Sequence, residues 1–322
     1  MKTRDQGLSR RTFLVGSSAA VAGALLSPGR ASGMMRRPGL ASGGRSRTGQ
    51  ARLAAGSIPA PVTGATVNPG AYHMRNWAKG AHRFDSYVGY PLATTIQKIY
   101  MTEGQYYTDP LPARITELAA VGCKFIICVY PSKTTDESSK LSNFLQLLNS
   151  HGIVYHAALV NEWNCKNKFA TPQAYLSYWN HYAPVVKAAG VPVANLVCAS
   201  SNKRETAKIE PGFPTNPLPD AYWIDYYATA YIYNIRLHSS GGLLQQAERY
   251  GVPAGIGEFG WTAWPSGQGP TKAQWDAYCS YLAHTAPRLP LGCLYWGVSG
   301  PDIVTSANDF KVPGIKRVMS AF

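Results

Sequence analysis

Acidic side chains are scarce in this 322-residue sequence, which holds 17 Asp and Glu against 31 Lys and Arg. Ten of the basic residues fall within positions 1–57, together with a single acid, Asp5. Beyond position 57 the balance is 21 basic to 16 acidic residues, and the basic ones form no stripe. Because nucleic-acid binding needs such a stripe on the folded part of a protein, we expect no nucleic-acid partner.

The cysteines lack a metal-binding pattern. Six occur, but none forms C-x-x-C or joins a His-rich cluster, so the usual zinc spacings are absent. Four of them, Cys123, Cys128, Cys198 and Cys293, lie in or beside apolar segments, where a free thiol packs as a small hydrophobe. We predict no metal and no organic cofactor. Six cysteines allow 15 pairings, and the sequence does not choose among them.

The sequence also lacks long apolar runs. A short apolar run near the N-terminus belongs to a targeting pattern. Ser9–Leu14 reads SRRTFL and precedes the short apolar run Val15–Leu26, with a cleavage signal ending at Ala31. A run of this length does not span a bilayer as a resident helix. We predict that residues 1–31 are a twin-arginine signal peptide, removed during secretion of the folded protein. The alternative is a flexible basic N-terminus.

Residues 32–57 consist mainly of Gly, Ser, Ala and Arg. Such a composition buries too little apolar surface to offset the entropy of ordering, so a disordered linker is expected. No 20-residue apolar run follows, which predicts no membrane attachment after export.

Residues 58–322 have the length and the alternating pattern of one (β/α)8 TIM barrel, a single α/β catalytic domain that we expect to be monomeric. The strands are apolar almost throughout, as in a parallel sheet covered by helices. One interval, Asn202–Ala221, holds four prolines and predicts a long rim loop in place of most of a helix. The predicted strands are Gly70–Arg75, Thr95–Met101, Lys124–Tyr130, Ile153–Val160, Asn195–Ala199, Tyr222–Ala228, Pro253–Glu258 and Leu291–Trp296.

Two stretches share a feature that carries chemistry. Val154–Asn164 (VYHAALVNEWN) and Val252–Trp261 (VPAGIGEFGW) are apolar runs that end in a glutamate followed by an aromatic residue. In a TIM barrel the active site lies at the carboxyl ends of the strands, so Glu162 and Glu258 are expected at one rim, on opposing sides of the mouth. A facing pair of carboxyl groups, one protonated and one ionised, is what cleavage of a glycosidic bond requires.

Each glutamate also has a purely structural interpretation. Glu162 would cap a turn or pair with Lys166, and Glu258 would be one half of a buried ion pair, because a carboxylate after an apolar strand is costly without a partner. Asn161 and Asn164 would contact sugar hydroxyls or stabilise the turn. Asp225 faces inward or outward according to a register that the sequence leaves open.

Aromatic residues cluster at or just beyond the predicted strand ends. Aromatic faces stack on sugar rings, yet tryptophan in a barrel mouth is also ordinary packing. His156 lies within a strand and is expected to be a core histidine. We predict substrate contacts from Asn161 and from a set of aromatics: Trp163, Tyr231, Trp261 and Trp296, with Trp264 evenly balanced between the two roles.

The order of these motifs resembles clan A retaining β-glycosidases, and within them glycoside hydrolase family twenty-six, the endo-β-mannanase and β-glucanase group. Asn161-Glu162-Trp163-Asn164 is similar to that family's His-Glu-Met-Asn, and Thr171-Pro172 opens a similar next helix. Asp220–Tyr231 looks like its sixth strand, with Tyr231 near the nucleophile, and Val252–Gly260 resembles the nucleophile motif. The resemblance covers about residues 70–320.

The resemblance implies Glu162 as acid/base, Glu258 as nucleophile, net retention and a carboxyl separation near ~5 Å. Asn161 departs from the family, which has His there, although other clan A families carry Asn. The expected function is therefore a secreted endo-β-glycosidase acting on a β-linked polysaccharide, with mannan, glucan and xylan not distinguished. The alternatives are a catalytically silent glycan-binding barrel and a transglycosylase.

Overall fold

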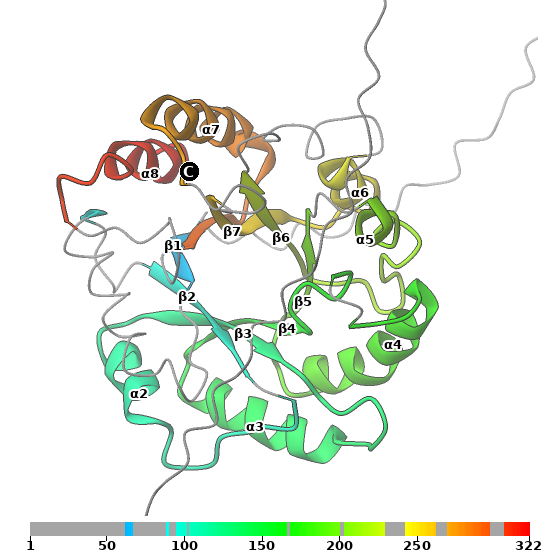
Figure 1. The fold of residues 1–322 in the computed structure, drawn as a ribbon. Coiled ribbons are helices and arrows are strands. Elements are labelled where there is room, and N and C mark those ends of the chain that lie inside the picture. Colours follow the sequence, from blue (N-terminus) through cyan, green and yellow to red (C-terminus); the bar gives the residue numbers. More distant parts are fainter. Residues whose placement is uncertain are drawn as a thin grey trace, which may run out of the picture. The chain divides into compact units, whose positions relative to one another are not determined.

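A closed barrel of eight parallel strands forms the centre of the unit Leu53–Phe322, with helices around its outside (Figure 1). This computed structural model describes residues 62–66, 88–89, 95–101, 103–165, 168–199, 203–228, 242–261, 269–296 and 306–322, all within the unit Leu53–Phe322. Each strand pairs in parallel with its neighbours in chain order, and β8 closes on β1. The strands are β1 Val62–Thr66, β2 Thr95–Tyr100, β3 Lys124–Val129, β4 Val154–Leu159, β5 Val193–Cys198, β6 Ala221–Ala228, β7 Ala254–Trp261 and β8 Gly292–Trp296.

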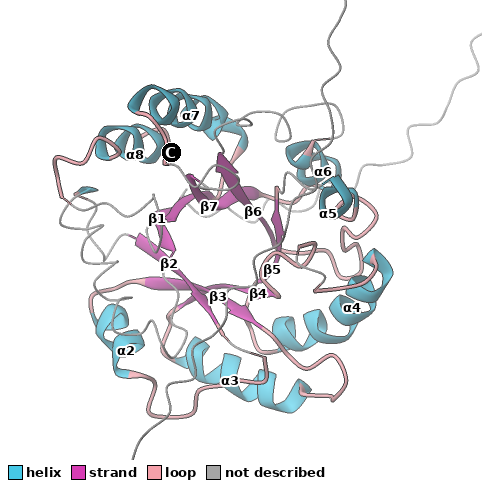
Figure 2. Cartoon of the chain, viewed as in Figure 1, coloured by secondary structure: helices cyan, strands magenta, loops and turns pink. Residues whose placement is uncertain are grey.

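The helices between the strands begin and end where local chemistry dictates (Figure 2). Thr171 caps α4 by accepting a hydrogen bond from the Ala174 backbone at 3.1 Å, and Pro172 occupies the first turn. Thr271 and Gln274 form a reciprocal capping box on α7. The helices are α2 Ala113–Ala120, α3 Ser138–Ser150, α4 Pro172–Ala188, α5 Lys203–Ala207, α6 Leu243–Tyr250, α7 Lys272–Thr285, the 3₁₀ helix η3 Ala286–Arg288 and α8 Val312–Met319.

The predicted TIM barrel is confirmed, with one correction to its strands. The slot between β2 and β8 is filled by Val62–Thr66, not by the predicted strand Gly70–Arg75. That predicted segment lies outside the described residues. Val62–Thr66 reads VTGAT, a short and weakly apolar strand whose pairing on both sides is set by barrel closure, not by its own propensity. In Asn202–Ala221 a short α5 precedes an irregular segment, as predicted.

Side chains alternate along the strands between two buried layers. Alternate residues of β6 illustrate this, since Trp223 belongs to the cluster inside the barrel and Tyr222 and Ile224 belong to the cluster under the helices. Residues at inward positions near the carboxyl ends of the strands therefore face the barrel mouth. Among the described residues, no helix has the length and apolar character needed to cross a bilayer.

Candidate active site

The segment after β4 presents Glu162 from a strained turn. Val160 and Glu162 both have positive φ, 65° and 47°, which is costly for side chains other than glycine. The turn is held at both ends, because the Val160 amide donates to Val129 O at 3.0 Å and the Cys165 amide donates to Glu162 O at 2.9 Å. The Glu162 side chain is 14% exposed, so its carboxyl group is accessible from the mouth.

A bulge in β7 directs Glu258 into the barrel. Ile224 of β6 pairs with Ile256, but the next residue, Asp225, pairs with Glu258, so Gly257 is an extra residue in the ladder. Bulges re-aim side chains and are common beside active sites. Position 257 also requires glycine for a steric reason, because a Cβ there would lie 2.6 Å from Asp225 Oδ1. Glu258 is consequently buried, with 2% exposure.

The turn after β4 and the strands β6 and β7 bring three carboxyl groups together. One oxygen from each of Glu162, Asp225 and Glu258 lies within 4.8 Å of the other two. The sequence predicted the proximity of Glu162 and Glu258, and the inward direction of Asp225 resolves the register that it left open. Carboxylates this close repel one another when ionised, so the cluster needs either a counter-charge or a shared proton.

Lys98 of β2 supplies the counter-charge. Its Nζ donates to both Asp225 oxygens at 2.8 Å and to Glu258 Oε1 at 2.8 Å, and its side chain is fully buried. A buried ammonium satisfied in this way fixes the positions of its acceptors as well as their charge. Glu162, Asp225 and Glu258 have the atoms to ligate a cation, but a cation bound by all three would have to displace Lys98 Nζ from two of them.

Burial and the ion pairs act in opposite directions on these groups. Burial lowers the pKa of Lys98, but Asp225 and Glu258 more than compensate, and the net pKa lies well above its usual value. Burial raises the pKa of Asp225 to about 7, against the opposing effect of Lys98. Burial likewise raises the pKa of Glu258, and Lys98 opposes that rise. Lys98 therefore favours the ionised form of Glu258 in a site whose low polarity disfavours it.

Tyr227 holds the other oxygen of Glu258. Its hydroxyl donates to Glu258 Oε2, while Lys98 contacts Oε1, so both carboxyl oxygens of Glu258 have a donor. Tyr227 follows Asp225 by two residues in β6 and therefore lies on the same face of the strand. The orientation of the Glu258 carboxyl plane is thus set from two strands.

Glu162 has a looser environment. Lys168 Nζ lies 3.9 Å from Glu162 Oε2 and donates to the Asn161 carbonyl. Lys166, the partner considered from sequence, lies outside the described residues. Asn161 is 7% exposed, and its Oδ1 accepts from the Cys128 thiol at 4.0 Å. The predicted contact between Asn161 and a sugar hydroxyl stays a prediction.

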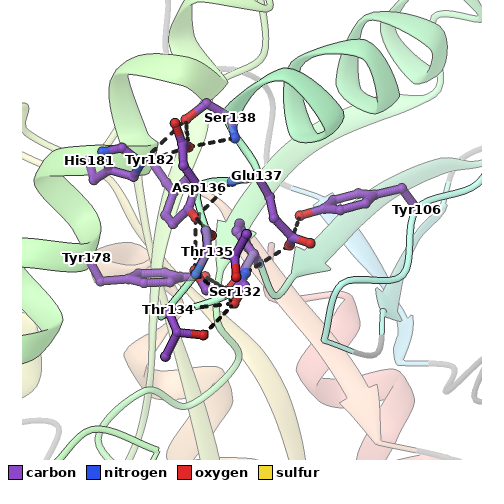
Figure 3. A network of polar contacts seen from close by, with 11 residues as sticks. Tyr106, Ser132, Thr134, Thr135, Asp136, Glu137, Ser138, Tyr178, His181 and Tyr182 are labelled. Carbon is purple, nitrogen blue, oxygen red and sulfur yellow. Dashed lines mark hydrogen bonds and ion pairs between the residues drawn. The ribbon is translucent and has the colours of Figure 1, made fainter.

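A polar cluster joins the loop between β3 and α3 to Tyr106 and to residues of α4 (Figure 3). In this loop the Ser132 amide donates to Glu137 Oε2 at 2.9 Å, and the Glu137 amide donates to the Tyr182 hydroxyl of α4 at 3.3 Å. His181 Nε2, also of α4, lies 3.1 Å from Asp136 Oδ1. A cavity of about 400 Å³ lies between this loop and the first turns of α4. The same loop reaches the β4 side, because Lys133 Nζ donates to the Lys168 carbonyl at 2.6 Å.

The aromatic predictions fare differently. Trp163 is fully buried and stacks on Tyr175, with ring centroids 4.0 Å apart and planes 3° from parallel. Its Nε1 donates to Asn195 Oδ1 at 3.1 Å. Trp261 is 2% exposed and belongs with Phe259 to the cluster under the helices. The structure corrects both predictions, since neither ring offers a face to a substrate.

Of the remaining residues singled out from sequence, one ends a strand, two lie outside the described residues and two have structural roles. Trp296 ends β8, at the expected rim, and its side chain is not described. Tyr231 and Trp264 lie outside the described residues. Asn164 stabilises the turn, because its side chain hydrogen-bonds to the backbone amide and carbonyl of Cys198, each at 2.9 Å. His156 is 5% exposed and accepts from Trp223 Nε1, and burial lowers its pKa to about 3.

Sequence reasoning missed Lys98 and Tyr227. A signal was present for Lys98, because it interrupts an apolar strand, TIQKIYM, as Asp225 interrupts YWIDYYA. A charge inside a buried strand requires a partner of opposite sign, so the two could have been paired. Tyr227 offered no comparable signal in a strand with four aromatic residues.

No protein-family model matches this sequence, and no curated protein matches it either. Solved structures do match. One is a family 39 glycoside hydrolase from the gut symbiont Bacteroides cellulosilyticus WH2, with a TM-score of 0.53 and 14% identity over 82% of this chain and 64% of that one. Another is the hyperthermostable endo-1,4-β-D-mannanase from Thermotoga petrophila RKU-1, with a TM-score of 0.53 and 10% identity over 81% of this chain and 100% of that one.

A further structure, the endo-β-1,4-mannanase from Thermotoga petrophila, has a TM-score of 0.50 and 10% identity over 83% of this chain and 77% of that one. The chain spans less than two thirds of the length of the family 39 protein. At these identities the likeness shows the barrel fold alone, and the clan expected from sequence stays a prediction. The narrower family twenty-six assignment stays a prediction.

Proposed function

We propose that this protein is a retaining glycoside hydrolase that cleaves a β-linked polysaccharide by double displacement. The observation that carries the proposal is the separation of the two glutamates, whose nearest oxygens lie within 4.8 Å of each other. Retaining enzymes hold their carboxyl groups at about 5–5.5 Å, whereas inverting enzymes leave roughly 6.5–9.5 Å for a water molecule. The barrel neighbours support the same class, since one is described as a family 39 glycoside hydrolase and another as an endo-1,4-β-D-mannanase.

The environments of the two glutamates support distinct roles. Glu258, held by Lys98 and Tyr227, is the fixed and ionised group and attacks the anomeric carbon. Glu162, partly exposed, protonates the leaving oxygen and then removes a proton from the water that releases the sugar. These two reaction steps need no metal and no organic cofactor. Asp225 is fully buried and acts through Lys98.

The substrate class, mode of attack and location are also proposals. We infer an endo-acting enzyme on a cell-wall polysaccharide, with Asn161, Tyr231 and Trp296 as the predicted subsite residues that remain. The twin-arginine pattern at Ser9–Leu14 supports secretion, and we propose that the folded protein is extracellular and monomeric.

Hydrolysis of a polysaccharide panel, measured by release of reducing ends, tests this proposal. The wild type is expected to release sugar from at least one of mannan, mixed-linkage glucan and xylan. Glu258→Gln should lose roughly 10³-fold or more of that rate while remaining folded. Glu210→Gln, at an exposed ion pair with Arg249, is the matched control and should keep full activity. Binding without release on every polymer would instead indicate a silent glycan-binding barrel.

A transglycosylase would use the same two glutamates. Product chromatography separates it from a hydrolase, because chain transfer gives products longer than the supplied oligosaccharide. We favour hydrolysis, and products that are all shorter than the substrate would agree with it.

A further inference from the structure

A lysine lies beside the proposed acid/base, in the segment that follows it. Lys168 Nζ is 3.9 Å from Glu162 Oε2, and it donates a hydrogen bond to the carbonyl of Asn161, the residue before Glu162. The Lys168 and Glu162 side chains are partly exposed, at 21% and 14%. The bond to the Asn161 carbonyl keeps the ammonium group next to the Glu162 carboxyl group, where its positive charge favours a negative charge on that group.

The backbone of Lys168 is also held in place. Its amide donates to the Cys165 carbonyl at 3.1 Å, and its carbonyl accepts from Lys133 Nζ at 2.6 Å. Phe169, the next residue, is buried, and its carbonyl accepts from Lys208 Nζ at 2.9 Å. Contacts from the loop after β3 and from the residue after α5 therefore position Lys168.

Double displacement moves one negative charge between the two glutamates. In the first step an oxygen of Glu258 bonds to the anomeric carbon, the bond from that carbon to the leaving oxygen breaks, and the Glu162 proton passes to the leaving oxygen. Glu258 is then a neutral ester, and Glu162 is a carboxylate. In the second step the oxygen of water bonds to the anomeric carbon, a water proton passes to Glu162, and the bond to Glu258 breaks.

Each end of this charge transfer has its own lysine. Lys98 contacts Glu258 and Asp225 at 2.8 Å, so it is the counter-charge while Glu258 is ionised. Once Glu258 is an ester, the new carboxylate at Glu162 lies beside Lys168. Asp225 opposes that charge, because one of its oxygens lies within 4.8 Å of an oxygen of Glu162. The charge of Lys168 offsets this repulsion.

We propose that Lys168 is a positioning residue that acts through Glu162, by stabilising the carboxylate that forms as Glu162 gives up its proton. This inference rests on the proposed function. Negative charge develops on Glu162 only where the leaving group takes its proton, so Lys168 accelerates cleavage of a bond between two sugars. A dinitrophenyl group leaves as a stable anion and needs no proton, so Lys168 has little effect on the first step with a dinitrophenyl glycoside.

Rates on two kinds of substrate test this role. The substrates are an oligosaccharide and the dinitrophenyl β-glycoside of the sugar whose polymer the wild type cleaves. Lys168→Met and Lys168→Gln, which remove the charge, should lower kcat/KM roughly 10-fold or more on the oligosaccharide and less than about 3-fold on the dinitrophenyl glycoside. Lys168→Arg keeps the charge and should recover most of the oligosaccharide rate. Circular dichroism checks that the variants remain folded.

Lys187→Met, at a partly exposed ion pair with Asp220, is the control and should leave both rates unchanged. Three results would overturn the inference while leaving the proposed function intact. They are an equal loss on both substrates when the charge of Lys168 is removed, no loss on the oligosaccharide, and no recovery in Lys168→Arg. A wild type that cleaves neither substrate would overturn the proposed function, and this inference with it.

Discussion

Lys98 Nζ of β2 lies 2.8 Å from Glu258 Oε1 of β7, and both side chains are buried, with exposures of 0% and 3%. The ammonium also contacts both oxygens of Asp225. A single buried cation therefore sets the charge and the position of the proposed nucleophile.

Lys98→Met should destabilise the protein strongly at pH 7.5, by about 3–5 kcal/mol, because it leaves buried carboxylates without a counter-charge. In the variant the pKa values of Asp225 and Glu258 rise further above their unfolded values. As the pH falls from 7.5 to 5, the folded variant gains protons that the unfolded chain does not, so its deficit relative to wild type shrinks. Urea unfolding at the two pH values measures this.

The matched control is Lys187→Met, which removes a partly exposed pair with Asp220 at 2.6 Å. Exposed pairs contribute little, so a loss of about 1 kcal/mol or less is expected. A deficit in Lys98→Met that is equally large at pH 7.5 and pH 5 would contradict the buried-charge account.

The pH dependence of kcat/KM in the wild type should reflect the effect of burial on the pKa of Glu258. A nucleophile must be ionised, and burial raises the pKa of Glu258. The acidic limb of kcat/KM should therefore fall at a pH above the ordinary value for glutamate, about 4.3. Initial rates from pH 3.5 to 8 give the midpoint, and a midpoint at or below the ordinary value would count against this assignment.

Tyr227→Phe removes one of the two donors to Glu258 without changing the size of the ring. Because that hydrogen bond favours the ionised carboxylate, its loss should raise the pKa of Glu258 and move the acidic limb to higher pH. We expect kcat to fall roughly 10- to 100-fold, within the range of single transition-state contacts. Tyr226→Phe, on the opposite face of β6, is the control, and an equal loss in both variants would mean that the effect is structural.

Gly257→Ala tests the bulge. The added Cβ would lie 2.6 Å from Asp225 Oδ1 and 3.6 Å from Lys98 Nζ, so the carboxylate must move. Displacement by even about 1 Å at a catalytic site can cost about 100-fold in rate. Circular dichroism establishes that the barrel persists, and a variant with wild-type kcat would show that the close approach at Gly257 is unimportant.

The sequence predicted the barrel and the two glutamates because both depend on local patterns. Apolar strands alternate with helices, and a strand that ends in Glu places it at the rim whatever the exact register. The same patterns do not decide to which side of a strand or turn a side chain points. Trp163 and Trp261 stand next to or near the glutamates in the chain, yet both rings point into the layer beneath the helices.

The partners of Glu258 depend on contacts between distant strands. Lys98 and Glu258 are 160 residues apart, and the bulge at Gly257 decides whether Glu258 faces inward at all. The charge of Lys98 within an apolar strand indicates that it has a partner, but nothing local identifies that partner or predicts the bulge in β7. The first strand was misplaced for a similar reason, since Val62–Thr66 is specified by the edges of β2 and β8 and hardly by its own composition.

The anomeric configuration of the first product, followed by proton NMR during cleavage of a β-linked oligosaccharide, tests the two-glutamate account most directly. The separation of Glu162 and Glu258 predicts that the β-anomer forms first and that the α-anomer appears later by mutarotation. Initial formation of the α-anomer would contradict the account, because inversion requires room for a water molecule between carboxyl groups that this barrel holds too close together.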